Sequence, residues 1–147
     1  MSRPPVFALV PIGRLRAHER VDEENVLELM EELRRTRTFA EPIWVARDSY
    51  VILNGHHRVE ALRRLGAERV PAWLLDYETD EVGLEPWRPG GSITKAEVIH
   101  RANRGDLFPP KTTRHQVHVG LAPRSTSLEE LGVELVSPRA APNADLQ

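Results

Sequence analysis

The stretch VILNGHHRVEALRRLG, residues 51–66, predicts that a short buried strand passes directly into a helix. Its first part is an apolar, β-branched run of the kind found in strands. In its second part Val59, Leu62 and Leu65 recur at helical spacing, and Gly66 stands where a left-handed C-terminal cap belongs. Two adjacent histidines therefore lie at a junction between a strand and a helix.

Strands and helices alternate irregularly on both sides of this junction. Apolar and β-branched runs predict strands at 5–12, 43–46, 50–53 and 68–78. Helical periodicity and capping residues predict helices after Asp22, over 56–65, and from Thr94 to Gly105. The first of these has one apolar stripe: Val26, Leu29, Met30 and Leu33. We expect a loop over 79–92, which is rich in proline, glycine and acid. Because hairpin and crossover connections are mixed, the fold class is α+β, with a small mixed sheet and packed helices.

Composition narrows the possible functions. The 147 residues are most simply one domain, and the absence of cysteine excludes disulfides, thiolate metal sites and a cysteine nucleophile. With 20 basic and 22 acidic residues, no global field attracts nucleic acid or an anionic membrane. The apolar runs are too short to cross a membrane and no signal peptide is evident, so we expect a cytoplasmic protein. Nothing in the pattern specifies an oligomeric state.

The start of the helix at 56–65 is a candidate anion site. Unpaired backbone N–H groups of a first helical turn point outward together and attract anions. Gly55 would let a phosphate approach the backbone closely. Arg58 and the imidazoles of His56 and His57 would add donors from the same turn. We expect the preceding Asn54 to be the N-cap.

Two plainer interpretations compete with an anion site. An Asn-Gly pair is a strong signal for a two-residue hairpin turn, although the residues that follow have helical rather than alternating spacing. The histidines could also be incidental polar residues on an exposed turn, because many helix starts bind no anion. We therefore set the hairpin aside, and this stretch by itself leaves only the second interpretation open beside an anion site.

A second candidate phosphate site is PPKTTRH, residues 109–115, which we expect to be a loop stiffened by its prolines. It combines three potential cations with two hydroxyl donors: Lys111, Arg114, His115, Thr112 and Thr113. Such a set can clamp a phosphate, but most basic runs of this kind are solvated surface loops.

A third candidate is Glu19, which follows His18 in the segment before the first predicted helix. A carboxylate in a loop can act as a general base or as a metal ligand. An ordinary surface acid is the commoner case for a single glutamate. Glu19 therefore needs a partner elsewhere in the chain before it identifies an active site.

Together these segments resemble the free serine kinases of the ParB/sulfiredoxin superfamily. Residues 55–58 match the superfamily signature of glycine, a variable residue, histidine or arginine, and arginine, and NGHHR is similar to the kinases' D-G-H-H-R. RLGAERVPAWLLDY and RGDLFPPKTTRH also have close counterparts there, as has the His-Glu pair at 18 and 19. The resemblance covers most of residues 7–115.

The resemblance implies a ParB/sulfiredoxin-like, nucleotide-binding, kinase-like domain over 1–115. From its composition we expect the C-terminal tail over 116–147 to be partly disordered, at its last residues 138–147. It implies transfer of a phosphoryl group from ATP or ADP to the hydroxyl of L-serine or a related compound, with Mg²⁺. The expected partners are thus a nucleotide and a small hydroxyl amino acid.

The resemblance also implies a role for each candidate residue. Glu19 matches the catalytic base. Residues 55–58 would hold the nucleotide phosphates with Mg²⁺, and residues 111–115 would bind phosphate from the other side. Trp87 and Asn54 would lie beside the amino-acid substrate. Asn54 stands where the family has aspartate, and the chain lacks a large insertion that the kinases have after the tryptophan.

Other functions of the superfamily fit less well. Sulfiredoxin chemistry needs a cysteine at the position of His56, so it is excluded. The tail after His115 has neither helical periodicity nor a basic excess, so DNA binding of the partition-protein type is not expected. A non-catalytic, ParB-like nucleotide-binding regulatory module remains as the alternative. Asn54 favours that alternative, whereas Glu19, Trp87 and PKTTRH favour the kinase, which we prefer.

Overall fold

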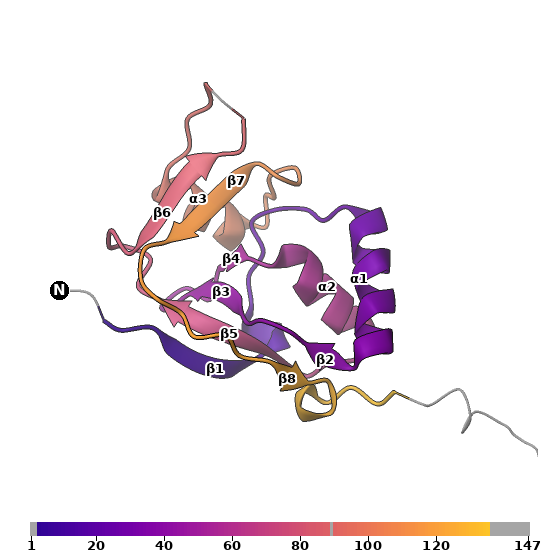
Figure 1. The fold of residues 1–147 in the computed structure, drawn as a ribbon. Coiled ribbons are helices and arrows are strands. Elements are labelled where there is room, and N and C mark those ends of the chain that lie inside the picture. Colours follow the sequence, from indigo (N-terminus) through magenta and orange to yellow (C-terminus); the bar gives the residue numbers. More distant parts are fainter. Residues whose placement is uncertain (1–2, 89, 136–147) are drawn as a thin grey trace, which may run out of the picture.

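The computed structural model describes residues 3–88 and 90–135, and its centre is a four-stranded mixed sheet in the order β1-β5-β3-β4 (Figure 1). β1 is antiparallel to β5, β5 is parallel to β3, and β3 is antiparallel to β4. The strand bounds are β1 Val6–Pro11, β3 Ile43–Ala46, β4 Ile52–Asn54 and β5 Arg69–Leu75. The predicted α+β class with a small mixed sheet is confirmed.

Helices α1 (Glu23–Thr36) and α2 (His56–Arg64) lie side by side next to this sheet (Figure 1). Asp22 caps α1 as predicted, because its carboxylate accepts a hydrogen bond from the Glu24 N–H at 3.1 Å. The predicted apolar stripe of α1 is buried at Val26, Met30 and Leu33, and Leu29 lies at its edge. Gly66 has the predicted left-handed conformation after α2.

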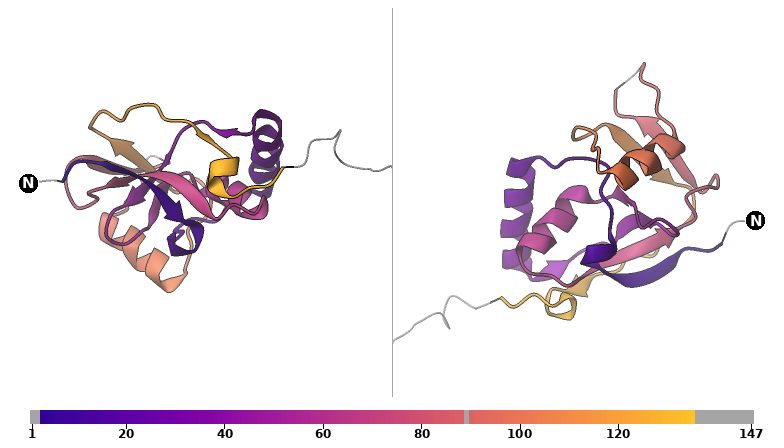
Figure 2. Two further views of the ribbon diagram at one scale, coloured as in Figure 1. Left: turned by 90° about the horizontal axis from the view of Figure 1, so that it is seen from below. Right: turned by 180° about the vertical axis from the view of Figure 1, so that it is seen from behind.

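A second layer consists of the antiparallel pair β6 (Val82–Pro86) and β7 (Thr113–Val117), with α3 (Lys95–Arg104) packed against it (Figure 2). α3 begins and ends as predicted, at a Thr94 cap and a left-handed Gly105. Two expected loops were wrong in part. Residues 79–92 contain β6, and the end of 109–115 belongs to β7. These strands pair with each other across a long stretch of sequence, which local composition does not reveal.

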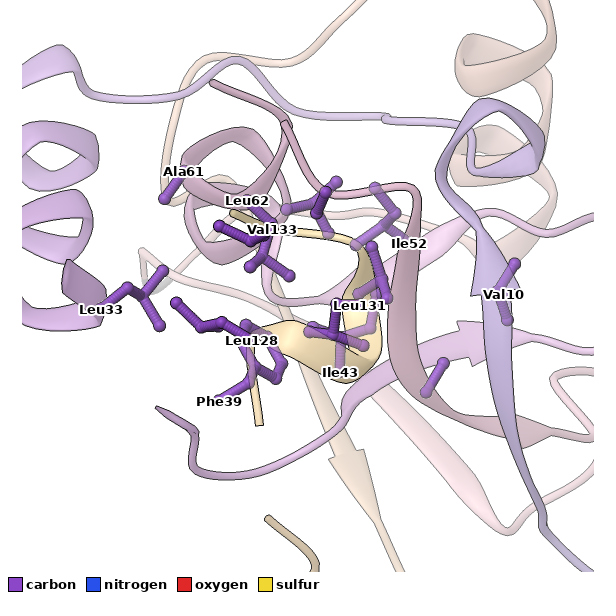
Figure 3. Close-up of a cluster of buried hydrophobic side chains, with 14 of the residues drawn as sticks. Val10, Leu33, Phe39, Ile43, Ile52, Ala61, Leu62, Leu128, Leu131 and Val133 are labelled. Atoms are coloured by element: carbon purple, nitrogen blue, oxygen red, sulfur yellow. The ribbon is translucent and has the colours of Figure 1, made fainter. Parts of the chain in front are cut away.

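The chain after β7 returns to the main sheet. β8 (Thr126–Ser127) pairs with β2 (Thr38–Phe39), and the short 3₁₀ helix η2 (Glu129–Leu131) follows; another, η1 (Ile12–Arg14), follows β1. Leu128, Leu131 and Val133 are buried in the main core beside residues of α1, α2 and β3 (Figure 3).

The boundary expected at residue 115 therefore does not mark the end of the packed chain. Residues 126–133 supply apolar surface that α1, α2 and the sheet need in order to bury their own. The disorder expected over 138–147 concerns residues outside those described. Within the described ranges, no helix is both long and apolar enough to cross a membrane.

Candidate active site

One cavity of about 650 Å³ lies between α1, the start of α2 and the β6–β7 layer. The three candidate segments, far apart in the sequence, meet at its walls. It is lined by Glu19, Asn54, Gly55, His56, His57, Arg58, Trp87, Lys111, Thr113, Arg114 and His115, all of them predicted site residues. Thr112 is the exception, because it faces away from this cavity and its hydroxyl donates to the Pro109 carbonyl at 2.7 Å.

Glu19 is buried, with 7% of its surface exposed, rather than being a surface acid. Its Oε1 accepts a hydrogen bond from the Lys111 N–H at 3.1 Å. Its Oε2 accepts one from the Thr113 N–H at 2.8 Å and another from the Thr113 hydroxyl. The neighbouring backbone is anchored by a strand-like pairing of Glu19 with Phe108. The carboxylate is therefore held by the segment that was predicted to bind phosphate.

The junction between β4 and α2 differs in detail from the prediction. The N-cap is Gly55 instead of Asn54, and no side chain caps the first turn. Gly55 has a φ of +113°, and a Cβ at this position would lie 2.4 Å from Ile43 Cγ2. Glycine is thus required here by the close packing of β3 against the helix start, as well as by the left-handed backbone. The Asn54 side chain is exposed at the cavity.

The paired histidines attach the segment before α1 to α2. His56 Nε2 accepts a hydrogen bond from the His18 N–H at 3.1 Å, and His57 Nε2 accepts one from the Asp22 N–H at 2.9 Å. Because an imidazole nitrogen that accepts carries no proton, neither Nε2 atom can donate to a bound anion. The backbone N–H groups of the first turn remain as the donors that α2 offers to the cavity.

Arg58 is also committed to the fold. Its Nη1 donates to the Glu41 carbonyl at 2.7 Å, and its guanidinium lies over the Phe39 ring at 5.5 Å from the centroid. Burial lowers the pKa of Arg58. The guanidinium lines the cavity and also fixes the loop before β3. Its expected role, donating hydrogen bonds to a bound phosphate, is therefore combined with a structural role in holding this loop.

Three buried histidines form an edge-to-face cluster at the cavity, which His56 and His115 also line. The ring of His18 contacts that of His56 at 4.5 Å between centroids and that of His115 at 5.6 Å. Burial lowers the pKa of His18 to about 4 and that of His115 to about 3, and it lowers the pKa of His56 well below its ordinary value. All three are therefore neutral at pH 7. Tyr77, which sequence reasoning missed, forms a hydrogen bond between its hydroxyl and His115 Nε2 at 2.8 Å.

Positive charge reaches the cavity from the β7 side. Lys111 is exposed and has a left-handed backbone, with a φ of +59°. The Arg114 guanidinium lies over the ring of Trp87, 5.0 Å from its centroid. Trp87 is 44% exposed, and its backbone N–H donates to the Thr112 carbonyl at 3.1 Å. An aromatic face and two cations thus stand together at one wall of the cavity.

Sequence reasoning missed the opposite wall. α1 contributes Asn25, Glu28, Leu29 and Glu32, which repeat at helical spacing beside the apolar stripe. That repeat could have been noticed as a second face of the helix. Nothing local shows that this face meets a cavity, because the facing wall comes from β7.

Comparison with known proteins agrees with the fold. A family model described as "ParB N-terminal domain" matches residues 8–83, just over half of the chain. Solved structures of similar shape include a free serine kinase in complex with AMP, with a TM-score of 0.77 and 20% identity, covering 86% of this chain and 93% of that one. The chain belongs to the ParB N-terminal domain family, and it has the fold of the free serine kinase.

Curated relatives resemble about two thirds of the chain. An ADP-dependent L-serine kinase of Thermococcus kodakarensis is 29% identical over 69% of this chain and 43% of its own. An ATP-dependent L-serine kinase of Desulfurococcus mucosus is 34% identical over 67% and 40%. A ParB-like protein of Sulfolobus acidocaldarius is 42% identical over 61% and 47%. The chain thus spans less than half the length of the curated relatives it matches.

Proposed function

We propose that this protein transfers a phosphoryl group from a nucleotide to the hydroxyl of L-serine, giving O-phosphoserine. The observation that carries the proposal is the bonding of the Glu19 carboxylate to the backbone of Lys111 and Thr113 at a cavity that also contains the start of α2. A buried carboxylate beside phosphate-binding groups is the arrangement that such a transfer needs. The names of the two kinase relatives support it.

The nucleotide phosphates would bind between α2 and β7. Free N–H groups and the helix dipole favour an anion at the first turn of α2, which no side chain caps. Lys111 and Arg114 bring positive charge from the facing wall. Phosphoryl transfer depends mainly on positioning and charge neutralisation, and this pair of walls supplies both. ADP and ATP are both named as donors among the relatives, and either fits this proposal.

Mg²⁺ would arrive with the phosphates. Among the described residues, no group of three or more His, Cys, Asp or Glu side chains could hold a metal ion without help. This fits Mg²⁺, which commonly keeps several waters and takes its other ligands from substrate phosphates and one or two protein oxygens. The protein oxygens at the cavity that could serve are those of Asn54, Glu28 and Glu32.

The amino acid would bind beside Trp87 and Asn54, with its hydroxyl within reach of Glu19. The exposed indole of Trp87 offers an apolar face, and the Asn54 amide offers a donor and an acceptor. Glu19 would accept the hydroxyl proton as the oxygen attacks the terminal phosphorus. Its burial excludes most competing water from that step.

The test is incubation of the purified protein with Mg²⁺, L-serine and either ADP or ATP, with phosphoserine followed by ³¹P NMR. We expect turnover that disappears in Glu19→Gln. Glu31→Gln is the matched control, because Glu31 is exposed on α1 and does not line the cavity. Nucleotide binding without phosphoserine from any hydroxyl amino acid would contradict the kinase and favour a non-catalytic nucleotide-binding module.

A further inference from the structure

A chain of hydrogen bonds connects the buried His18 to Glu19 through the side chain of Thr113. His18 has no exposed surface, and its Nε2 lies 2.8 Å from Thr113 Oγ1. The same hydroxyl donates to Glu19 Oε2. The direct separation of His18 Nε2 and Glu19 Oε2 is 3.8 Å, which is too long for a hydrogen bond. His18 therefore acts on the carboxylate only through Thr113.

The Thr113 hydroxyl has a single proton, so it cannot donate to both neighbours. If that proton points to Glu19, His18 must be the donor to Thr113 Oγ1. Glu19 Oε2 then accepts two hydrogen bonds, from the N–H and the O–H of Thr113. Oε1 accepts only one among the described residues, from the Lys111 N–H, and so it retains a free acceptor position.

We propose that His18 is a positioning residue for the transfer: its Nε2–H fixes the Thr113 hydroxyl onto Glu19 Oε2 and leaves Oε1 as the atom that takes the substrate proton. That the proton comes from the substrate hydroxyl rests on the proposed function. The hydrogen bonds among His18, Thr113 and Glu19 do not depend on it. They identify which of the two carboxylate oxygens is the base, and they give His18 and Thr113 defined roles.

His18 suits this role because it stays neutral. Its burial lowers its pKa to about 4, so it cannot take up a proton from Glu19 near pH 7. The other titratable groups around Glu19 are His57 on α2 and Lys111 before β7, and the rings of His56 and His115 contact His18 edge-to-face. His18 is thus a fixed donor instead of a proton store.

The first experiment determines the His18 tautomer by ¹⁵N NMR of the imidazole nitrogens in the wild-type protein at pH 7, with His18→Gln used to assign the resonances. We expect Nε2 to be protonated and Nδ1 to be bare. The competing tautomer carries the proton on Nδ1, where the Ile52 carbonyl would accept it. That result would overturn the inference, because Nε2 would then accept the Thr113 hydroxyl. The tautomer does not depend on turnover, so an absence of phosphoserine would contradict only the proposed function.

The second experiment measures kinetics. Thr113→Val removes the hydroxyl but keeps the backbone N–H, and we expect kcat to fall about 10- to 100-fold with little change in KM for the nucleotide. Thr113→Ser should recover most of the loss, and His18→Gln, which keeps a donor, should lose less than His18→Leu.

A purely structural role for Thr113 and His18 predicts a different result. The variants would then lower the melting temperature and the active fraction while kcat per active site stayed constant. Equal losses of kcat in Thr113→Val and Thr113→Ser would overturn the inference.

Discussion

Gly55 lies so close to Ile43 that a Cβ built on its backbone would be 2.4 Å from Ile43 Cγ2. Its φ of +113° is also unfavourable for a residue with a side chain. We expect Gly55→Ala to lower the free energy of unfolding by about 2–4 kcal/mol, from the sum of overpacking and backbone strain. Urea denaturation followed by circular dichroism measures this loss.

Gly13→Ala is the matched control for that variant. A Cβ at Gly13 would meet no heavy atom within 4 Å. Its effect should stay within about 0.5 kcal/mol. Similar losses in the two alanine variants would show that the contact with Ile43 does not constrain position 55.

The buried cluster of three histidines predicts a loss of stability in mild acid. His18, His56 and His115 have pKa values below that of an unfolded histidine, so they remain neutral in the folded protein while the unfolded chain takes up protons. Their contribution is complete above the unfolded pKa of about 6.5 and is lost as the pH falls below it. Each can remove up to about 1.4 kcal/mol per pH unit.

Urea midpoints measured between pH 7.5 and 5 test this prediction, because most carboxylates protonate only below that window. We expect a steep fall below pH 6.5. His115→Gln removes one member of the histidine cluster and should reduce the slope of the urea midpoint against pH by about a third. A midpoint independent of pH down to 5 would contradict the neutral, buried state of all three.

The two cavity arginines should respond differently to substitution. Arg58→Ala removes the bond to the Glu41 carbonyl and the contact with Phe39, so we expect a loss of about 2–3 kcal/mol in the free energy of unfolding. Arg114 is half-exposed and rests on Trp87, so Arg114→Ala should leave stability nearly unchanged and weaken nucleotide binding about 10-fold.

Calorimetric titration with ADP and ATP, combined with thermal unfolding, separates these outcomes for the arginine pair. Arg114→Lys, which keeps the charge but loses the planar stacking group, should fall between wild type and Arg114→Ala. An unchanged affinity of Arg114→Ala for ADP and ATP would show that Arg114 on β7 does not bind the nucleotide phosphates.

The returning C-terminal segment should be essential for stability. Leu131 is fully buried in the main core, so Leu131→Ala should cost about 2–5 kcal/mol. Leu27, 52% exposed on α1, provides a leucine control that should change stability by no more than about 0.5 kcal/mol. If urea denaturation gave equal values for the two variants, the packing of residues 126–133 against the core would be wrong.

The elements that could be predicted are those specified by nearby residues. The caps at Asp22 and Thr94 and the left-handed glycines at 66 and 105 depend on contacts within a few positions, so their patterns are local. β6 could not be predicted in the same way. Its pairing with β7 joins Glu85 to Arg114 across the whole of α3, and no short-range pattern records that contact.

The candidate site shows the same division. Residue types and spacing indicated a helix start, a basic run and a carboxylate, and the resemblance to the serine kinases connected them. The structure then gave these residues different roles. Thr112 faces away from the cavity, and Arg58 binds the loop before β3. The imidazoles of His56 and His57 accept hydrogen bonds from backbone N–H groups. These outcomes depend on which partner lies opposite each atom.

By itself, the sequence determined the secondary structure around the strand-to-helix junction, the absence of thiol chemistry and the set of residues to consider. Only the tertiary structure decided that Glu19 is buried against Thr113, that η2 completes the core, and that α1 forms one wall of the cavity. The physical reason is range. Helical periodicity and caps act over one or two turns, whereas burial and hydrogen-bond partners are set by segments that meet only when the chain has folded.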